Sequence, residues 1–408
     1  MPYLVISAPQ MPMSVKKIPF TRIFNISGTN RYIIGNNTEV VIMTRKIYLD
    51  HIRTGTVLMV VVYHVFYLFN AQGVLGGFGG FSDVQYQDAI LYVLYPFFMV
   101  LLFLIAGISA RYSLMKKTAK EFINSRTAKL LVPSTLGLFV FYWICGFFNV
   151  AISGSWSMMP DEMPLIAKYL ICVLSGIGPL WFAQMLWLFS LSLLLIRKID
   201  KNNKFYDFCG KANLPVIISF VLLMWGSAQI LNTPIITVYR FGIYYTAFLL
   251  GYFVFSHDKV QDCLAKYSVW FLAAALVSCV AYVIYWFGKN YASDECLQDW
   301  TTAVYLWVCV LAVMGCGKRW FDKKNQVMDY LIKRSFGIYA LHYTAMLFLC
   351  CAMIYYMNLP VALIYIIAII GIFAMSIGLY ELISRIPVLR YLVLGERRKK
   401  QREIQAEN

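Results

Sequence analysis

Long apolar runs recur through most of the chain and restrict its fold more than any other feature. A helix needs about 17–25 residues to cross the hydrocarbon core of a bilayer, and the sequence contains ten runs of that order. They lie near residues 54–70, 89–110, 130–150, 179–196, 214–231, 237–256, 267–287, 300–316, 335–356 and 360–382. Their residues do not alternate as the strands of a membrane barrel do, so the runs must be helices. We therefore predict an all-α polytopic membrane protein, a bundle of about ten transmembrane helices.

The composition agrees with a membrane bundle and excludes several classes of soluble protein. Of the 408 residues, 60% are hydrophobic and 14% are charged, whereas soluble domains have about 25% charged residues. The net charge of +16 does not indicate nucleic-acid binding, because Lys and Arg gather in a few loops and at the C-terminus rather than on one basic face. Soluble enzymes and nucleic-acid-binding modules are therefore excluded.

The distribution of basic residues predicts how the helices are oriented. Four alternate loops hold 19 Lys and Arg residues, and the loops between them hold two. The basic loops are 111–129, 197–213, 257–266 and 317–334. Because basic loops stay on the cytoplasmic side, we expect a multi-pass protein of the inner or plasma membrane with both termini in the cytoplasm.

Three segments follow from this layout. Residues 1–43 are predicted to be a cytoplasmic N-terminal tail that is poorly ordered, and Met43 is a candidate start residue. Residues 44–384 form the predicted membrane domain of ten helices, and residues 385–408 form a basic cytoplasmic tail. The long loop 151–178 has room for an interfacial helix near 163–174.

The cysteines do not indicate a metal or redox site. The chain has ten of them, several inside apolar runs, and no CxxC pair. Cysteine inside such runs behaves as a small hydrophobic residue, and a zinc or redox motif needs closer spacing. We therefore expect no metal ion and no permanently bound cofactor.

The first apolar run carries an arginine and a histidine that share one helix face. Arg53 lies near its start and His64 lies eleven residues later, which is close to three helical turns and about 16 Å along the axis. Ionisable groups inside spans usually face a cavity or a partner, and an imidazole suits a general base. A neutral histidine bonded across helices is the alternative. Asp50 precedes Arg53 by one turn and is placed for an ion pair with it.

Four more polar residues are candidates for ligand binding. Arg126 and Lys129 precede the third run on the predicted cytoplasmic side, where they could bind phosphates or act only as positive-inside residues. Arg240 lies near the outer end of the sixth run and could line a cavity or extend to the outer interface. His342 is a second intramembrane histidine, with a cavity-lining or a structural role. The predicted catalytic residue is His64, and the predicted binding residues are Arg53, Asp50, Arg126, Lys129, Arg240 and His342.

Several motifs, in this order, resemble those of the acyltransferase-3 family of integral membrane acyltransferases. The resemblance covers about residues 45–396. The motifs are Arg53 with His64 (the family's Arg-x10-His), Pro96-Phe97-Phe98 with Ala106-Gly107, Gly178-Pro179-Leu180-Trp181-Phe182, Arg240 with Gly251-Tyr252, and Ser335-Phe336-Gly337-Ile338-Tyr339 with His342. Two positions depart from the family: Lys129 replaces an arginine, which removes the bidentate fork, and Ala106 replaces a serine.

The resemblance implies a membrane O-acyltransferase that resembles polysaccharide O-acetylases and succinyltransferases. It implies that acyl-CoA, acetyl-CoA first, is the co-substrate and enters from the cytoplasm, and that an acetyl or succinyl group passes to a hydroxyl of a cell-envelope carbohydrate. His64 would then be a general base or an acyl relay, and Arg53, Arg126 and Lys129 would suit the CoA phosphates. The expected partners are the lipid bilayer and a carbohydrate or glycolipid acceptor, without nucleic acid.

A ten-helix transporter or flippase for an anionic or glycolipid substrate is the alternative. Such transporters often carry inverted repeats and broken helices in paired positions, which this sequence does not show, so the acyltransferase is favoured. An inactive relative that serves as a partner or sensor is a third hypothesis. The acyl group, the acceptor, direct transfer against a relay, and assembly as a homo-oligomer or with a partner protein stay open.

Overall fold

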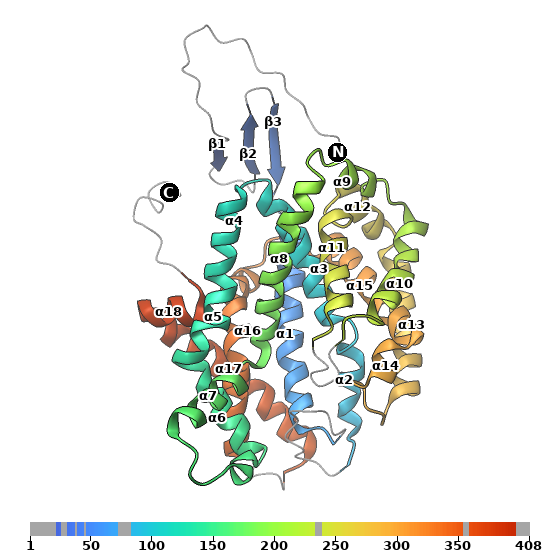
Figure 1. Cartoon of the computed structure of the whole chain (residues 1–408). Helices are drawn as coiled ribbons and strands as arrows, with labels where there is room; N and C mark the ends of the chain where they lie inside the picture. Colours follow the sequence, from blue (N-terminus) through green and yellow to red (C-terminus); the bar gives the residue numbers. More distant parts are fainter. Residues whose placement is uncertain are drawn as a thin grey trace.

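The structure is a computed structural model of the chain. It describes residues 22–25, 31–36, 39–44, 46–71, 83–232, 239–353 and 359–396. Most of these residues are helical, and the long helices run side by side along one axis of the molecule (Figure 1).

The helices follow the apolar runs of the sequence. In chain order they are α1 Ile47–Phe69, α2 Ala89–Leu94, α3 Phe98–Leu114, α4 Ala119–Arg126, α5 Val132–Ser134, α6 Trp143–Ile152, α7 Leu165–Ser175, α8 Trp181–Ile199, α9 Lys204–Cys209, α10 Leu214–Ala228, α11 Phe241–Phe253, α12 Asp258–Lys266, α13 Ser268–Trp286, α14 Asp294–Gln298, α15 Trp300–Trp320, α16 Gln326–Met353, α17 Val361–Arg385 and α18 Pro387–Leu394. Short 3₁₀ turns are η1 Tyr86–Asp88, η4 Ser155–Met158 and η5 Gly178–Leu180. Each predicted span therefore contains helix, and the all-α fold class of the membrane domain is confirmed.

Helix length divides the predicted spans into full-length and shorter ones. Within the described residues, seven helical segments are long and apolar enough to cross a membrane. Two others at predicted spans, α10 and α11, have 15 and 13 residues, which is shorter than a full crossing. The multi-pass character is confirmed, and the count of ten stays a prediction. A helix, α7, also occupies the loop region where we expect an interfacial helix, and its place at a membrane surface stays a prediction.

Helix α1 lies inside the bundle. It contacts α3, α15, α16 and α17, and Figure 1 shows it near the middle of the molecule. Fourteen of its 23 residues are buried, as expected for a helix that is apolar on most sides. Side chains of α1 therefore face neighbouring helices in several directions, and a site on this helix can draw on all of them.

Helices α3 and α11 approach each other closely because each presents a glycine to the other. A Cβ atom added to Gly107 would lie 2.0 Å from the carbonyl oxygen of Phe248, and one added to Gly251 would lie 2.0 Å from that of Leu104. Small residues at such crossings allow two backbones in a membrane to touch. The pair fixes α3 against α11.

The third predicted span is an irregular helix. After α4 the chain forms a π-helical turn, η2 Thr127–Leu131, then the short α5, a second π-helical turn, η3 Leu138–Tyr142, and α6. The backbone leaves helical geometry at Thr135 (φ −129°, ψ −76°), two residues after Pro133. Proline removes a helical hydrogen bond, and π-turns often occur at functional sites. Arg126 and Lys129 lie at the first of these irregularities.

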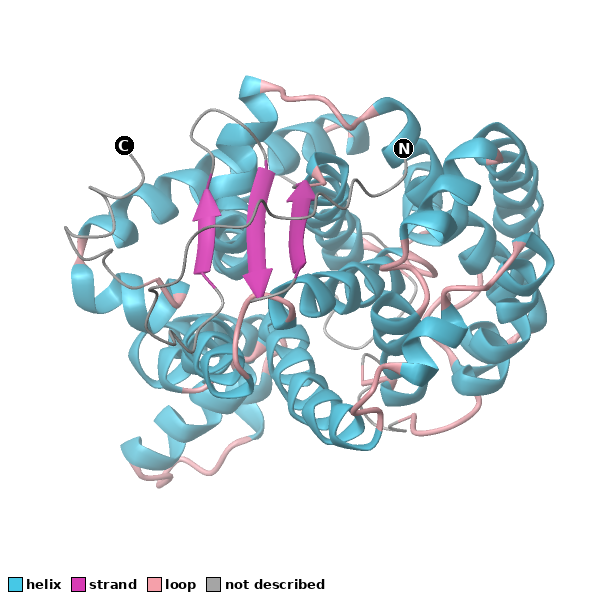
Figure 2. Cartoon of the chain, turned by 90° about the horizontal axis from the view of Figure 1, so that it is seen from above, coloured by secondary structure: helices cyan, strands magenta, loops and turns pink. Residues whose placement is uncertain are grey.

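The N-terminal segment contains a small sheet that the sequence analysis did not predict. Strands β1 Arg22–Asn25, β2 Arg31–Asn36 and β3 Glu39–Thr44 pair in antiparallel order β1-β2-β3, with Ile33 opposite both Phe24 and Ile42. Figures 1 and 2 show the sheet across one end of the helical bundle. The sequence predicts a poorly ordered tail over residues 1–43, and the strands differ from that prediction where they occur. The β-branched residues in β3 favour a strand there.

The basic loops come together at that same end of the bundle. The start of α4, the end of α8, α9 and α12 lie toward the sheet in Figure 1, whereas α2, α6 and α7 lie toward the opposite end. The alternation of basic and neutral loops along the sequence therefore corresponds to two ends of the molecule. That the basic end faces the cytoplasm stays a prediction.

Candidate active site

Two histidines from distant helices meet inside the bundle. His64 of α1 is partly buried, and His342 of α16 is fully buried. The Nε2 atom of His342 lies 3.3 Å from the Nδ1 atom of His64, and the ring centroids are 4.9 Å apart. The sequence analysis names both residues as candidates, and the structure brings them into direct contact.

The hydrogen bonds around the two rings fix where their protons lie. His342 Nδ1 is 2.7 Å from the carbonyl oxygen of Tyr339, and His64 Nδ1 is 2.7 Å from that of Val60. A carbonyl oxygen only accepts, so in the neutral rings each Nδ1 carries the proton and each Nε2 keeps a lone pair. The His64 Nδ1–H then also points toward the Nε2 lone pair of His342. His342 Nε2 faces His64, whereas His64 Nε2 has no such contact among these bonds. We therefore assign the lone pair that is free to react to His64 Nε2.

Aromatic rings enclose the His64 imidazole. The rings of Tyr63, Tyr67 and Tyr343 pack edge-on against it, with centroid distances of 5.1, 5.9 and 5.9 Å. Tyr343 also donates a hydrogen bond of 3.3 Å to Asn149 Oδ1 on α6. These contacts hold the ring in place and surround it with phenol hydroxyls and apolar faces, which is a setting suited to a ligand that has both carbon and hydroxyl surface.

The other end of α1 carries the predicted cationic residue. Arg53 Nη2 lies 2.9 Å from Asp50 Oδ1, which is the ion pair that the i,i+3 spacing predicts, and the Arg53 side chain is 39% exposed. The helix is continuous between Arg53 and His64, so the two lie about 16 Å apart along it. A path for a ligand between Arg53 and His64 stays a prediction.

Arg126 and Lys129 gather near Arg53. The positive charges of the three residues are close enough to repel one another, and the carboxylate of Glu396 attracts Lys129. Burial raises the pKa of the Glu396 carboxyl, and the neighbouring charges of Lys129 and Arg390 lower it. Within the described residues neither Arg126 nor Lys129 has a carboxylate oxygen within 4 Å. Such a cluster is a favourable place for a polyanionic ligand.

The family assignment follows from a comparison with known sequences. The acyltransferase domain of the acyltransferase-3 type matches residues 46–381. This chain belongs to the acyltransferase-3 family. The resemblance stated from its motifs is therefore confirmed, and the acyltransferase carries its histidine pair and its cationic cluster inside the matched region.

Individual relatives of the acyltransferase share one printed name. Proteins named glucans biosynthesis protein C from Escherichia coli and from Shigella boydii serotype 4 are 23% identical to it over 385 residues, which covers 86% of this chain and 95% of the relative. The protein of that name from Shigella dysenteriae serotype 1 is 22% identical over 389 residues, with the same coverage. No solved structure matches the acyltransferase.

Arg240 lies apart from the histidine pair in the acyltransferase. It is 5% exposed, and its Nη2 donates a hydrogen bond of 2.8 Å to the carbonyl oxygen of Leu297. It also interacts electrostatically with Tyr95, whose ring stacks on Tyr63 at 5.4 Å. The guanidinium therefore ties the start of α11 to α14 and does not extend to the surface. A role in ligand binding stays a prediction.

Neither a disulfide nor a cluster of metal-ligating side chains is found among the described residues. All eight cysteines whose side chains the structure describes are free thiols. Among the described residues no group of three His, Cys, Asp or Glu side chains is arranged to hold a metal ion.

Sequence reasoning missed the contacts that hold the site together. It did not pair His342 with His64, and it did not place Tyr67 or Tyr343 beside the imidazole. The sequence does contain a signal for these contacts, because a mainly apolar run holds Tyr339, His342 and Tyr343 within one short stretch. Polar residues that recur within one turn of a span indicate a face turned toward the bundle interior.

Proposed function

We propose that this acyltransferase moves an acyl group, acetyl or succinyl, from acyl-CoA to a hydroxyl of a cell-envelope carbohydrate. The observation that carries the proposal is the contact between His64 and His342, which leaves a lone pair on His64 Nε2. The family supports acyl transfer, and the relatives' name, glucans biosynthesis protein C, favours a carbohydrate acceptor. The family also favours an enzyme over a transporter or flippase.

In direct transfer, His64 Nε2 takes the proton of the acceptor hydroxyl. The hydroxyl oxygen attacks the thioester carbonyl carbon, a C–O bond forms, and the C–S bond breaks to release CoA as a thiolate, which receives the proton from the imidazolium. Nδ1–H, held by Val60 and His342, stabilises the imidazolium that forms in between. His342 is thus a positioning residue in this scheme.

A covalent relay is the second route through the same atoms. His64 Nε2 attacks the thioester carbon, CoA leaves as the thiolate, and the acyl-imidazole then passes its acyl group to the acceptor hydroxyl, whose proton the released imidazole nitrogen takes up. Both routes need the lone pair on Nε2. Trapping of a labelled acyl group on His64 in the absence of acceptor distinguishes the relay from direct transfer.

The donor would bind with its phosphates at Arg53, Arg126 and Lys129. Phosphate oxygens form strong hydrogen bonds with guanidinium and ammonium groups. Among the described residues, Arg53 pairs with Asp50, Glu396 attracts Lys129, and Arg126 lies in no ion pair. The extended pantetheine arm would then bring the thioester along α1 toward His64. The bilayer itself is the expected setting, with the donor on the basic side.

The first prediction concerns the two histidines. In purified protein reconstituted with an acyl-CoA and a glucan acceptor, His64→Gln should lower kcat by at least about 100-fold, since general acid–base catalysis contributes that much or more. His342→Gln keeps an acceptor group and should lose less, whereas His342→Phe should lose more and shift the pH profile of kcat. Transfer of radiolabel from acyl-CoA to glucan is the measurement.

His257→Gln is the matched control for those variants. His257 contacts the carbonyl oxygen of Tyr206 through Nε2 and stacks on the Tyr206 ring, at the basic end of the bundle. The control should keep the full rate. Undiminished turnover by His64→Gln in a folded protein contradicts the catalytic assignment, and an effect of His342→Phe on KM alone contradicts its positioning role.

A further inference from the structure

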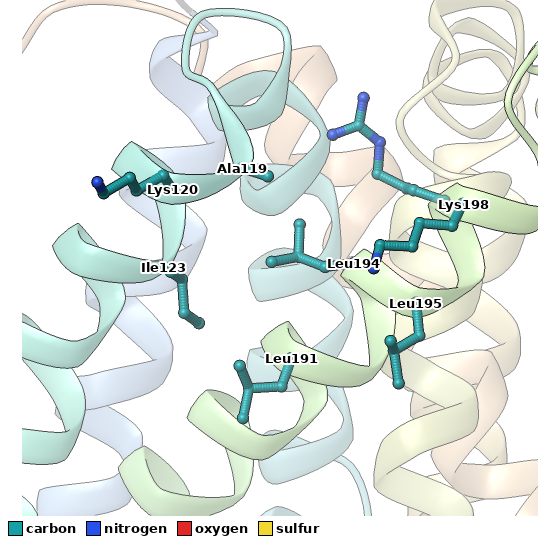
Figure 3. A pocket seen from close by; sticks show the side chains of 8 residues that line it. Ala119, Lys120, Ile123, Leu191, Leu194, Leu195 and Lys198 are labelled. Carbon is teal, nitrogen blue, oxygen red and sulfur yellow. The ribbon is translucent and has the colours of Figure 1, made fainter.

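A groove of about 730 Å³ opens between α4 and α8, away from the histidine pair. Figure 3 shows its side chains, which come from the start of α4 and the last turns of α8. They are Ala119, Lys120, Ile123, Leu191, Leu194, Leu195, Arg197 and Lys198. The groove has two parts, an apolar wall and a basic rim, and each part restricts what can bind.

The apolar wall follows from helix periodicity. Leu191, Leu194 and Leu195 recur at i, i+3 and i+4 on α8, and Ile123 faces them from α4, so the wall is one continuous apolar strip. Leu195 is 62% exposed, which shows that the strip is open to the surroundings. Two to three helical turns from the rim, the two segments are joined, because Trp187 Nε1 donates a hydrogen bond of 2.9 Å to Thr127 Oγ1. The groove is therefore a slot between two helices that meet at Trp187 and Thr127.

The basic rim lacks counter-charges. Within the described residues, none of Lys120, Arg197 and Lys198 lies in an ion pair. Two carboxylates lie close to the rim in sequence, and both are engaged elsewhere. Glu121 accepts hydrogen bonds from the Thr118 backbone and hydroxyl at 2.9 and 3.0 Å as the capping box of α4. Asp200 accepts hydrogen bonds from the backbone N–H groups of Phe205 and Tyr206 at 3.1 and 3.2 Å. Three positive charges therefore stand at the mouth of an apolar slot.

We propose that this groove binds one anionic phospholipid, with its phosphate at the basic rim and one acyl chain along the leucines. The rim supplies charge complementarity, and basic residues near a membrane surface favour anionic lipids by about fivefold in affinity per residue. The half-buried Leu191 and Leu194 and the exposed Leu195 match a lipid chain in the leaflet that borders the basic loops. The lining contains no aromatic ring and no hydroxyl to recognise a nucleotide base. The proposal does not depend on acyl transfer.

Native mass spectrometry of the full chain in neutral detergent tests the proposal, with dioleoyl phosphatidylglycerol and dioleoyl phosphatidylcholine as probes. One phosphatidylglycerol should bind at least tenfold more tightly than phosphatidylcholine. The variant K120Q/R197Q/K198Q should lose at least tenfold in that affinity. The control K201Q/K204Q/K211Q removes three charges from the neighbouring basic segment outside the groove lining and should bind as the unmodified protein does.

A second pair of variants tests the slot without altering charge. Leu194→Trp fills the groove and should reduce phosphatidylglycerol binding, whereas Leu188→Trp, at a 49% exposed position of α8 outside the lining, should not. Equal binding by all variants, or equal binding of the two lipids, overturns the proposal. Displacement of phosphatidylglycerol by micromolar acyl-CoA also overturns it, because the groove would then belong to the donor path.

Discussion

Asp50 and Arg53 show how one helical turn can prepare a cation for a ligand. The 2.9 Å ion pair holds the guanidinium at the edge of the bundle, while 39% of the Arg53 side chain stays exposed. An exposed i,i+3 pair contributes little to stability, about 0.2–1 kcal/mol. We therefore propose that the pair acts mainly to orient the guanidinium, which lies near the positive charges of Arg126 and Lys129.

Replacement of Arg53 by Gln should raise KM for acyl-CoA by about tenfold or more and change kcat less, because a charge-assisted hydrogen bond to phosphate contributes about 1.5–3 kcal/mol. Asp50→Asn keeps the cation and should change KM by a factor of about three at most. Initial rates over a range of acyl-CoA concentrations check both. Lys324→Gln, on the exposed loop before α16, is the control, and an Arg53→Gln enzyme with an unaltered KM would remove Arg53 from the donor site.

The residues of the site could be named from the sequence, but their contacts could not. The i,i+3 and i,i+11 spacings on one helix follow from 3.6 residues per turn, so Asp50, Arg53 and His64 could be placed relative to one another. The contact between His64 and His342 joins residues 278 positions apart. Hydropathy shows that two runs are helices and says nothing about which helices are neighbours, so this contact required the structure.

At the scale of elements, two glycines determine how closely α3 and α11 cross. Backbone atoms of the two helices touch at Gly107 and Gly251, where added Cβ atoms would lie 2.0 Å from carbonyl oxygens. No side-chain rotation relieves an overlap with a backbone atom. Van der Waals packing at small residues is a main source of helix association in a membrane, so this crossing should tolerate no larger residue.

Gly251→Ala should lower stability by about 1–3 kcal/mol, as overpacking does, although alanine favours helix over glycine. Gly378→Ala in α17 is the matched change, since nothing lies within 4 Å of an added Cβ there, and it should stabilise by up to about 1 kcal/mol. Unfolding in mild detergent, followed by circular dichroism, measures whether each substitution lowers or raises the free energy of unfolding. A Gly251→Ala protein as stable as the parent would show that α3 and α11 are not held this closely.

The elements themselves divide into predictable and unpredictable ones. Runs such as 300–316 and 360–382 became α15 and α17 because a lipid-spanning segment has no alternative to helix. The breaks after Arg126 and at Thr135 could not be placed, because Pro133 alone does not determine how neighbouring helices satisfy the freed carbonyls. The strands within residues 22–44 were missed since composition alone suggested a tail.

For the whole molecule, the two ends of the bundle differ in charge. The start of α4, the end of α8, and α9 and α12 lie at the same end of the bundle as the small sheet (Figures 1 and 2). Arg53, Arg126 and Lys129 lie toward that end, and His64 lies about 16 Å further along α1. The donor and acceptor of a transfer reaction would in this way approach the same imidazole from opposite sides.

Reporter fusions test that orientation. A green fluorescent protein fused after Asn203, between α8 and α9, should fluoresce, and alkaline phosphatase fused after Asn290, between α13 and α14, should be active. The reason is that basic loops remain in the cytoplasm while neutral loops cross. Exchange of the two reporters is the control and should silence both. Active alkaline phosphatase after Asn203 would reverse the orientation and, with it, the side from which the donor arrives.

The distance in sequence between the two imidazoles also has a consequence for synthesis. His64 lies on α1, whereas His342 lies on α16 and is synthesised 278 residues later. Until α16 is inserted, the Nδ1–H of His64 keeps its contact with the Val60 carbonyl oxygen but lacks its contact with His342. Under the proposed function, a nascent chain without α16 would thus lack the complete histidine pair, and full activity would appear only late in biogenesis.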